Sequence, residues 1–272
     1  MSYGCELKHL LLKYNTYTYK HLCQMKSILL SLCILIYSLN SIACETTLTL
    51  GLGNEWKPYY FEEQGKPTGA DIQYIKNILT EANICLAYLK IADSLRSHVE
   101  LEKGNIDFLA GATYNSDRDS YAQFSSPYRS ESIRIFWLKN KYQHLTDATL
   151  SDLVKAGLKG VSNRGSYLGS HYLDIMKQTS SIHLVSTIKQ RMKMLEHGRV
   201  DFAIEDEMAG LKYLSQHYLE NIELHPFVVF QNDVSFMFSR KTVPKRVIDK
   251  INLIIKQNKT KYEQILLFYM AP

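Results

Sequence analysis

The hydrophobic pattern of residues 47–110 switches between a period of two residues and a period of 3.6. Residues 47–52 (TLTLGL) alternate between polar and apolar, which predicts a half-buried strand. Residues 69–82 place three isoleucines and Leu79 on one helical face. In order, the predicted elements are strand 47–52, helix 69–82, strand 84–91, helix 94–103 and strand 106–110. Strands that alternate with helices are typical of α/β folds with mainly parallel sheets.

An internal repeat indicates two such units. Residues 101–108 read LEKGNIDF, and residues 195–202, which lie 94 positions further on, read LEHGRVDF. In both copies a predicted helix ends at a glycine, and a strand begins at or beside an aspartate. Chance similarity within a common helix–glycine–strand pattern is the alternative. We predict two α/β lobes of roughly 100 residues each.

Each copy of the repeat continues into residues that suit a ligand. In open α/β sheets, ligands bind beyond the carboxyl ends of the strands. The first copy continues into residues 110–113 (AGAT), a glycine turn with a hydroxyl group. The second continues into residues 204–207 (IEDE), which supply carboxylates. We expect the two lobes to hold a ligand between them.

Three features together describe a site for an α-amino acid. Arg118 lies five residues after Thr113 and is suited to bind a carboxylate with two parallel hydrogen bonds. Residues 163–169 (NRGSYLG) form a turn before a predicted helix at 167–177, and such a turn presents N–H groups to an anion. Asp206 is suited to accept from an ammonium group.

Taken singly, these residues also have ordinary structural interpretations. Arg118 is compatible with a surface ion pair to a neighbouring aspartate. Ser166 is compatible with a helix N-cap, and Asp206 with an acid that complements a helix dipole. Trp56 follows the first strand, where it fits either an apolar or cation–π wall of the site or the core.

Charge and motifs exclude several classes of function. The formal net charge is +5, and residues 1–44 contribute +3 of it. The remaining chain holds 28 basic and 26 acidic side chains, with no basic stripe for nucleic acid. The sequence has no HExxH, no GxSxG, no P-loop and no ligand-like spacing among its nine histidines. We expect no metal, no cofactor and no nucleic-acid partner.

The N-terminal segment has the layout of an export signal. Residues 28–39 (ILLSLCILIYSL) form an apolar run of about 12 residues, short of the roughly 20 that span a bilayer. Lys26 precedes this run, and the small residues Ser41 and Ala43 follow it. We interpret residues 25–43 as a cleavable signal peptide, with an uncleaved anchor as the alternative, and residues 1–24 as an over-extended N-terminus. The expected location is the periplasm.

Two cysteines remain after such a cleavage. Cys44 directly follows Ala43, and the sequence SIAC loosely resembles a lipobox, so lipidation of Cys44 is one alternative. Pairing of Cys44 with Cys85 in an oxidising compartment is another. Cys85 as a buried thiol is the third.

Several motifs follow one another along residues 45–272. They are WKPYYF (56–61), GAD (69–71), LEKGNIDFLAGATYNSDRDSYAQFSSPYR (101–129), RGSYLG (164–169), GRVDFAIEDEMAG (198–210) and VSFMFSRK (234–241). In order and spacing these motifs resemble those of the type 2 periplasmic solute-binding proteins, in the amino-acid-binding branch associated with ABC importers.

The resemblance implies a fold and a partner. The fold would be two-lobed α/β, with a mainly parallel sheet flanked by helices in each lobe and a two-strand hinge. Lobe one would comprise residues 45–129 plus 235–272, and lobe two residues 130–234, with crossings near 128–131 and 231–235. The family implies a monomer that presents a small-molecule ligand to the membrane permease of an ABC importer.

The resemblance also assigns roles to individual residues. Arg118 and Thr113, with Gly111 in the same turn, match the positions that hold the ligand carboxylate. Asp206 matches the acceptor of the ammonium group. The remaining matches are Trp56, which would pack on the ligand side chain, and Ser166 and Tyr167 in the turn of the second lobe.

Three residues depart from the family pattern, and two other functions use the same fold. Asn115 stands where threonine is common, Tyr167 replaces a small hydroxyl residue, and Glu205 adds a charge beside Asp206. Some members are sensor domains. A few are cyclohexadienyl dehydratases, for which Glu205 or Asp206 would be the acid. We expect a binding protein rather than an enzyme.

Overall fold

The structure, a computed structural model, describes residues 44–91, 94–139 and 141–271. Residues 45–272 form one compact unit, distinct from residues 1–44. The predicted signal peptide and over-extended N-terminus lie outside the described residues. Within the described segments, no helix combines the length and apolar character needed to cross a bilayer.

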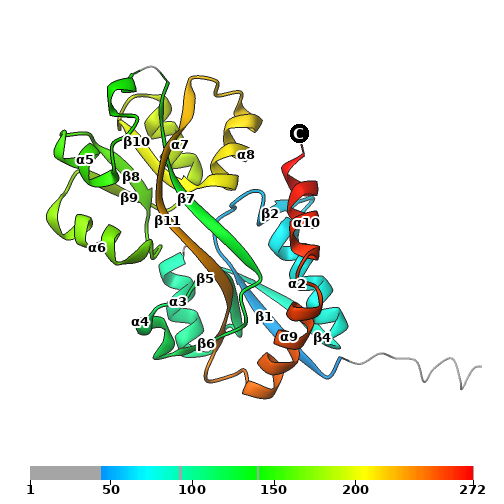
Figure 1. The fold of residues 1–272 in the computed structure, drawn as a ribbon. Coiled ribbons are helices and arrows are strands. Elements are labelled where there is room, and N and C mark those ends of the chain that lie inside the picture. Colours follow the sequence, from blue (N-terminus) through cyan, green and yellow to red (C-terminus); the bar gives the residue numbers. More distant parts are fainter. Residues whose placement is uncertain (1–43, 92–93, 140, 272) are drawn as a thin grey trace, which may run out of the picture. The chain divides into compact units, whose positions relative to one another are not determined.

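Strands of the compact unit form one continuous twisted sheet that passes through two lobes (Figure 1). Its order is β4-β1-β5-β11-β7-β10-β8-β9, with β6 beside β11. The bounds are β1 Thr46–Leu52, β4 Ile84–Lys90, β5 Phe108–Thr113, β6 Ala122–Phe124, β7 Arg129–Leu138, β8 Gly160–Asn163, β9 Ile182–Val185, β10 Phe202–Asp206 and β11 Ile222–Ser239. Parallel pairs lie in both halves, β4-β1-β5 in one and β9-β8-β10 in the other. The predicted α/β class is confirmed, but the sheet is mixed rather than mainly parallel, because β11 pairs antiparallel with β5, β6 and β7, and β7 pairs antiparallel with β10.

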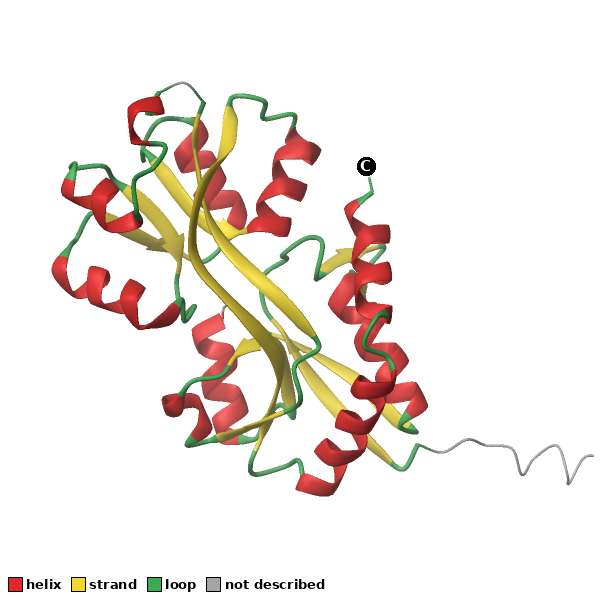
Figure 2. Ribbon diagram, viewed as in Figure 1, coloured by secondary structure: helices red, strands yellow, loops and turns green. Residues whose placement is uncertain are grey.

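Helices cover both halves of the sheet (Figure 2). The helices of the first lobe are α2 Ala70–Glu81, α3 Ser94–Lys103, α4 Ser116–Asp119, α9 Lys245–Gln257 and α10 Lys261–Met270. The helices of the second lobe are η1 Gln143–Leu145, α5 Leu150–Lys155, α6 Gly169–Gln178, α7 Ile188–Glu196 and α8 Glu207–His217. A small hairpin of β2 (Phe61–Glu63) and β3 (Lys66–Thr68) adds to the first lobe.

The predicted isoleucine face of α2 packs into the core of the first lobe. Ile72, Ile75 and Ile78 are buried there, together with the isoleucine face of α9 and strand residues such as Leu50. Each fully buried side chain of this size contributes about 1.5–3 kcal/mol to folding. A second buried cluster lies under α5 and α6 in the other lobe. The helical period therefore decides which face of each helix meets the sheet.

The repeat corresponds to the same structural device in each lobe. Asp107 accepts a hydrogen bond from the backbone N–H of Thr49 at 2.7 Å, and Asp201 accepts one from Lys159 at 2.9 Å. Both aspartates thereby tie the start of their strand to a neighbouring parallel strand. Because Asp107 lies in this turn, β5 begins at Phe108, two residues later than predicted. The two-lobe prediction from the repeat is confirmed.

Two long strands, β7 and β11, connect the lobes side by side (Figure 1). The predicted crossing points pair with each other in the antiparallel register, with Ser130 opposite Asp233. The Ser130 hydroxyl donates to Asp233 at 2.5 Å. The exact lobe boundaries stay a prediction.

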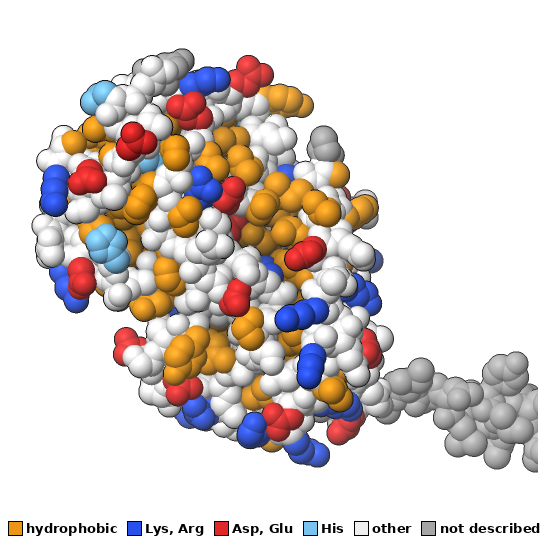
Figure 3. Space-filling model, in the orientation of Figure 1, with side chains coloured by type: hydrophobic (Ala, Val, Ile, Leu, Met, Phe, Trp, Pro, Cys, Tyr) orange, Lys and Arg blue, Asp and Glu red, His pale blue; other side chains and the backbone are white. Residues whose placement is uncertain are grey.

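Two cysteines lie near the starts of the first two predicted strands, and both are oxidised. Strands β1 and β4 are parallel neighbours, with Thr47 opposite Cys85. Cys44 and Cys85 are both disulfide-bonded. On the face shown in Figure 3, basic and acidic side chains are interspersed, and no single sign of charge dominates.

Candidate functional site

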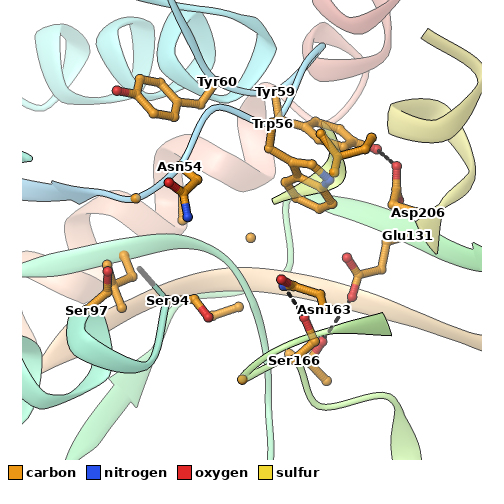
Figure 4. Close-up of a pocket in the computed structure, with 18 of the residues that line it drawn as sticks. Asn54, Trp56, Tyr59, Tyr60, Ser94, Ser97, Glu131, Asn163, Ser166 and Asp206 are labelled. Carbon is orange, nitrogen blue, oxygen red and sulfur yellow. Dashed lines mark hydrogen bonds between the residues drawn. The ribbon is translucent and has the colours of Figure 1, made fainter. Parts of the chain in front are cut away.

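A cavity of about 260 Å³ lies where the carboxyl ends of β5 and β10 face each other across the two lobes. This volume is slightly below the usual range of about 300–1,000 Å³ for ligand pockets, so it suits a small ligand. All the residues singled out from the sequence line it: Trp56, Gly111, Thr113, Arg118, Ser166, Tyr167 and Asp206. Figure 4 shows several of them converging on one space. That they bind a ligand stays a prediction.

Arg118 sits in the first lobe, on the short helix α4. Asn115 caps this helix by accepting from the Arg118 backbone N–H at 2.8 Å. The Arg118 side chain donates to the carbonyl of Thr113 at 2.9 Å and to that of Gly165, in the other lobe, at 3.5 Å. The surface-pair alternative is wrong, because Arg118 takes part in none of the ion pairs found among the described residues, and Asp119 pairs with Arg240 at 3.1 Å. Burial lowers the pKa of Arg118, so an incoming carboxylate would compensate its lost hydration.

Asp206 ends β10 and is the N-cap of α8. Its Oδ1 accepts from the backbone N–H of Ala209 at 2.9 Å and from the Tyr59 hydroxyl at 2.8 Å (Figure 4). Because both of these bonds use Oδ1, the other oxygen, Oδ2, has the capacity to accept from a ligand. The capping interpretation of Asp206 is therefore correct, and it is compatible with ligand binding. Burial raises the pKa of Asp206 to about 7.

Glu205, the extra charge beside Asp206, is fully engaged within the protein. Its Oε2 accepts from Arg191 Nε at 2.7 Å and Nη2 at 2.5 Å. Its Oε1 accepts from the Trp56 indole N–H at 3.1 Å and from the Asp206 backbone N–H at 3.0 Å. Because both oxygens accept hydrogen bonds and the carboxylate is ion-paired, Glu205 is poorly suited to donate a proton to a substrate.

Ser166, in the turn of the second lobe, is not the helix N-cap that the sequence allowed as an alternative. Helix α6 begins at Gly169 with Leu168 as N-cap, so Ser166 does not cap it. Instead the Asn163 amide donates to the Ser166 hydroxyl at 2.7 Å. Tyr167 packs edge-on against Phe230, with ring centroids 6.1 Å apart.

Direct contacts join the two lobes around the cavity. Trp56 bonds to Glu205 and Tyr59 bonds to Asp206, as described above. The Ser94 hydroxyl also donates to the carbonyl of Arg164 at 3.0 Å. These bonds connect first-lobe residues to second-lobe residues, so the structure has the lobes closed on each other.

Sequence reasoning missed four buried charges at the cavity: Arg191 beside Glu205, and a group formed by Asp71, Arg129 and Glu131. Asp71, Glu131 and Arg191 line the cavity, whereas Arg129 lies against Asp71 and Glu131, and all four residues have 9% or less of their surface exposed. Alternation along β7 was the available signal, because Arg129 and Glu131 share a face with the buried Ile133 and Ile135. A charged residue in register with core residues is buried unless the strand is irregular.

Arg129 is the centre of this charged group. Its guanidinium lies 3.4 Å from Asp71 and 3.9 Å from Glu131, and 4.1 Å from the centroid of the Tyr59 ring. None of its three nitrogens has a hydrogen-bond partner among the described residues. Gly111 has φ +62°, and a Cβ added there would lie 3.1 Å from Arg129 Nη2, so a glycine fits this turn best.

The Thr113 hydroxyl, which we expected to help hold the ligand carboxylate, is hydrogen-bonded to another side chain of the protein. The hydroxyl donates to Glu131 Oε1 at 3.1 Å. It can accept from a ligand N–H as it stands, and it must rotate to donate to a ligand carboxylate. Within the described ranges, no group of three or more His, Cys, Asp or Glu side chains is arranged to hold a metal ion.

Comparison of the sequence with known proteins identifies a family and similar proteins. A family model described as bacterial extracellular solute-binding proteins, family 3, matches residues 48–266. The L-cystine-binding protein TcyA of Bacillus subtilis (strain 168) is 22% identical over 222 residues, which are 80% of this chain and 78% of TcyA.

Solved structures share the fold at low sequence identity. One is an amino acid ABC transporter substrate-binding protein, AbpA, from Streptococcus pneumoniae, bound to L-arginine. It has a TM-score of 0.70 and 18% identity, and the match covers 82% of this chain and 94% of AbpA. Another is a histidine kinase sensor domain similar to periplasmic binding proteins, with a TM-score of 0.71, 19% identity, and 83% and 96% coverage.

Proposed function

Because this chain belongs to the bacterial extracellular solute-binding proteins of family 3, we propose that it binds an α-amino acid between its lobes and presents it to an ABC importer. The observation that carries the proposal is the pair Arg118 and Asp206, which reach one closed cavity from opposite lobes. A guanidinium and a carboxylate are the natural partners of the carboxylate and ammonium of an amino acid.

Each part of the headgroup has a partner of opposite charge. The ligand carboxylate lies on the Arg118 guanidinium and the N–H groups of the turn around Ser166. The ligand ammonium lies on Asp206 Oδ2 and the Thr113 hydroxyl oxygen. Trp56, held by Glu205, forms the wall beside the ligand side chain. Relatives named for cystine and arginine support an amino acid as the ligand class.

Closure of the lobes couples binding to transport. We place lobe one at 45–129 plus 235–272 and lobe two at 130–234, with the hinge in β7 and β11. A ligand that contacts both lobes shifts the population toward the closed form. The permease then recognises the closed, loaded protein. Residues 25–43 would direct the chain to the periplasm, where a disulfide at Cys44 and Cys85 is stable.

A thermal-shift panel tests the proposal. The protein is unfolded and refolded to remove carried-over ligand, then mixed with the twenty amino acids and with prephenate-like acids. A ligand at about 100 times its Kd adds about 2.7 kcal/mol to the free energy of unfolding, which is readily detected as a higher Tm. We expect one or a few amino acids to raise the Tm. A panel in which no amino acid does so contradicts the proposal.

Affinity for the amino acid should fall as the pH drops below 7. Only the ionised Asp206 can pair with an ammonium group, and burial raises its pKa to about 7. Each pH unit below 7 therefore weakens binding about tenfold, whereas above pH 8 the affinity levels off. Calorimetric titrations at pH 5.5 and 8.0 should differ by about 30-fold. Equal affinities at the two pH values would place the ammonium away from Asp206.

A ligand-sensing role is the second candidate, favoured by the similarity to the histidine kinase sensor domain. The same cavity and the same closure would serve it. Neighbouring genes for a permease and an ATPase support import, and a neighbouring kinase gene supports sensing. A dehydratase would have to use Asp206 as its acid, because Glu205 is locked to Arg191. Unchanged prephenate after incubation with the protein would exclude this function.

A further inference from the structure

We propose that the cavity selects amino acids that carry a second positive charge, and that Glu131 is the residue that decides this selection. The inference rests on the proposed function and narrows its ligand class. It follows from how the buried charges around the cavity pair with one another.

Carboxylates outnumber guanidinium groups around the cavity. Among the described residues that line or back it, the buried or half-buried charges are the carboxylates of Asp71, Glu131, Glu205 and Asp206 and the guanidiniums of Arg118, Arg129 and Arg191. His98 does not add a positive charge, because burial lowers its pKa to about 4. Glu55 at the mouth is exposed and adds a further negative charge. With all four carboxyl groups ionised, as the pairing with a ligand requires, the closed site therefore carries one buried negative charge in excess.

Pairing within the protein identifies where the excess lies. Glu205 pairs with Arg191 at 2.5 Å, and Asp71 pairs with Arg129 at 3.4 Å. The carboxylate and ammonium of an amino acid then engage Arg118 and Asp206. Of the four buried carboxylates described around the cavity, Glu131 is the one that remains.

Glu131 is placed to meet a ligand. Its side chain points into the cavity from β7 (Figure 4), and only 8% of its surface is exposed. Thr113 donates to Oε1, whereas Oε2 lies 3.9 Å from the nearest Arg129 nitrogen, which is too far for a hydrogen bond. Oε2 thus has the capacity to accept from a ligand cation.

A buried carboxylate without a counter-charge is unfavourable, so it is met by a cation or takes up a proton. An ammonium or guanidinium on the ligand side chain supplies the cation. A neutral side chain leaves only proton uptake, and burial, which raises the pKa of Glu131, already favours that route in the empty site. A cationic ligand releases this proton or prevents its uptake, and a neutral ligand does not.

Two pairs of near-isosteric ligands test the proposal by calorimetry. Arginine is compared with citrulline, and lysine with norleucine, on the wild-type protein and on Glu131→Gln. In the wild type we expect the cationic member of at least one pair to bind at least tenfold more tightly. In Glu131→Gln that preference should shrink at least tenfold, while the neutral member binds as well as before or better. Glu55→Gln is the matched control, and its exposed charge should change the preference less than threefold.

The results of these titrations distinguish a failure of the Glu131 inference from a failure of the proposed function. Equal or tighter binding of the neutral members, or an unchanged preference in Glu131→Gln, overturns the role of Glu131. Binding confined to other, uncharged amino acids overturns it as well but leaves the proposed function standing. If no amino acid binds, the proposed function itself fails.

A second measurement applies if Glu131→Gln does not fold. Proton exchange on binding to the wild type is read from titrations in two buffers of different ionisation enthalpy. Proton loss from Asp206 is common to all amino acids, so the two members of a pair are compared with each other. More proton release with the cationic member than with the neutral member of the same pair supports the proposal. Identical proton exchange with both members contradicts it.

Discussion

Replacing Asp206 with asparagine is expected to weaken binding of the amino acid by about 30- to 3,000-fold. Removing one charge of a buried, hydrogen-bonded ion pair costs about 2–5 kcal/mol, and each 1.4 kcal/mol is a factor of ten in affinity. The substitution would leave the ligand ammonium facing a neutral amide in the closed cavity. Calorimetry with the ligand found in the thermal-shift panel measures the change.

The asparagine variant is chosen because it preserves the fold around the site. The carbonyl oxygen of an asparagine can still accept from the Ala209 N–H and the Tyr59 hydroxyl, the two bonds that Asp206 makes through Oδ1. An alanine would also remove the N-cap of α8, at a further cost of about 0.5–2 kcal/mol. The Tm of Asp206→Asn without ligand should therefore stay close to that of the wild type.

A neighbouring acid outside the cavity provides the control. Glu207 follows Asp206 in the chain and pairs with Arg134 at 3.0 Å. Glu207→Gln should leave ligand affinity within about threefold, since partly exposed pairs contribute little. If Asp206→Asn behaves like Glu207→Gln, the ammonium does not lie on Asp206.

Replacing Arg118 with alanine is expected to weaken binding by about 100- to 20,000-fold. Hydrogen bonds to charged groups contribute about 1.5–3 kcal/mol each, and the guanidinium offers the carboxylate a pair of them. Arg118→Lys keeps the charge but not the planar fork, so it should recover only part of the affinity. Arg240→Ala, at an exposed ion pair with Asp119, is the control and should have little effect.

Chemical changes to the ligand show which group Arg118 holds. The carboxamide of the identified amino acid retains the ammonium but not the carboxylate. In the wild type the carboxamide should bind much more weakly than the amino acid. In Arg118→Ala this preference should become much smaller, because the charged partner of the carboxylate is gone and only the N–H groups of the turn around Ser166 remain. An undiminished preference in Arg118→Ala would assign the carboxylate to another residue.

Local rules predicted much of the fold. Helix α3 has the predicted bounds, 94–103, because its period and its terminal glycine are both local signals. The repeat predicted two lobes because the same turn, with an aspartate that ties it to a neighbouring strand, recurs in each. Errors arose at element ends, as at β5, where a side-chain bond to a strand 58 residues away delays the start.

The seven candidate site residues lie together because each lies in the carboxyl-terminal part of a strand or in the segment that follows a strand. Sheet order brings such positions to one edge, and the general rule for open α/β sheets anticipated this. Whether each of these residues has an ordinary structural role or faces the cavity depends on contacts with residues that are distant in the chain. Arg118 reaches Gly165, 47 residues further on, and this bond could not be read from the sequence around Arg118.

The sequence by itself determined the elements, the two lobes and the residues offered to a ligand, because periodicity, turn chemistry and the repeat act over a few residues. Only the tertiary structure decided which charges are already neutralised. Glu205 is paired by Arg191 from α7, and Arg129 sits between Asp71 and Glu131, which come from α2 and β7. Ion pairing depends on distances in space and not on separation in the chain. Glu131 can therefore be identified as the acid that remains for a ligand only from the assembled sheet.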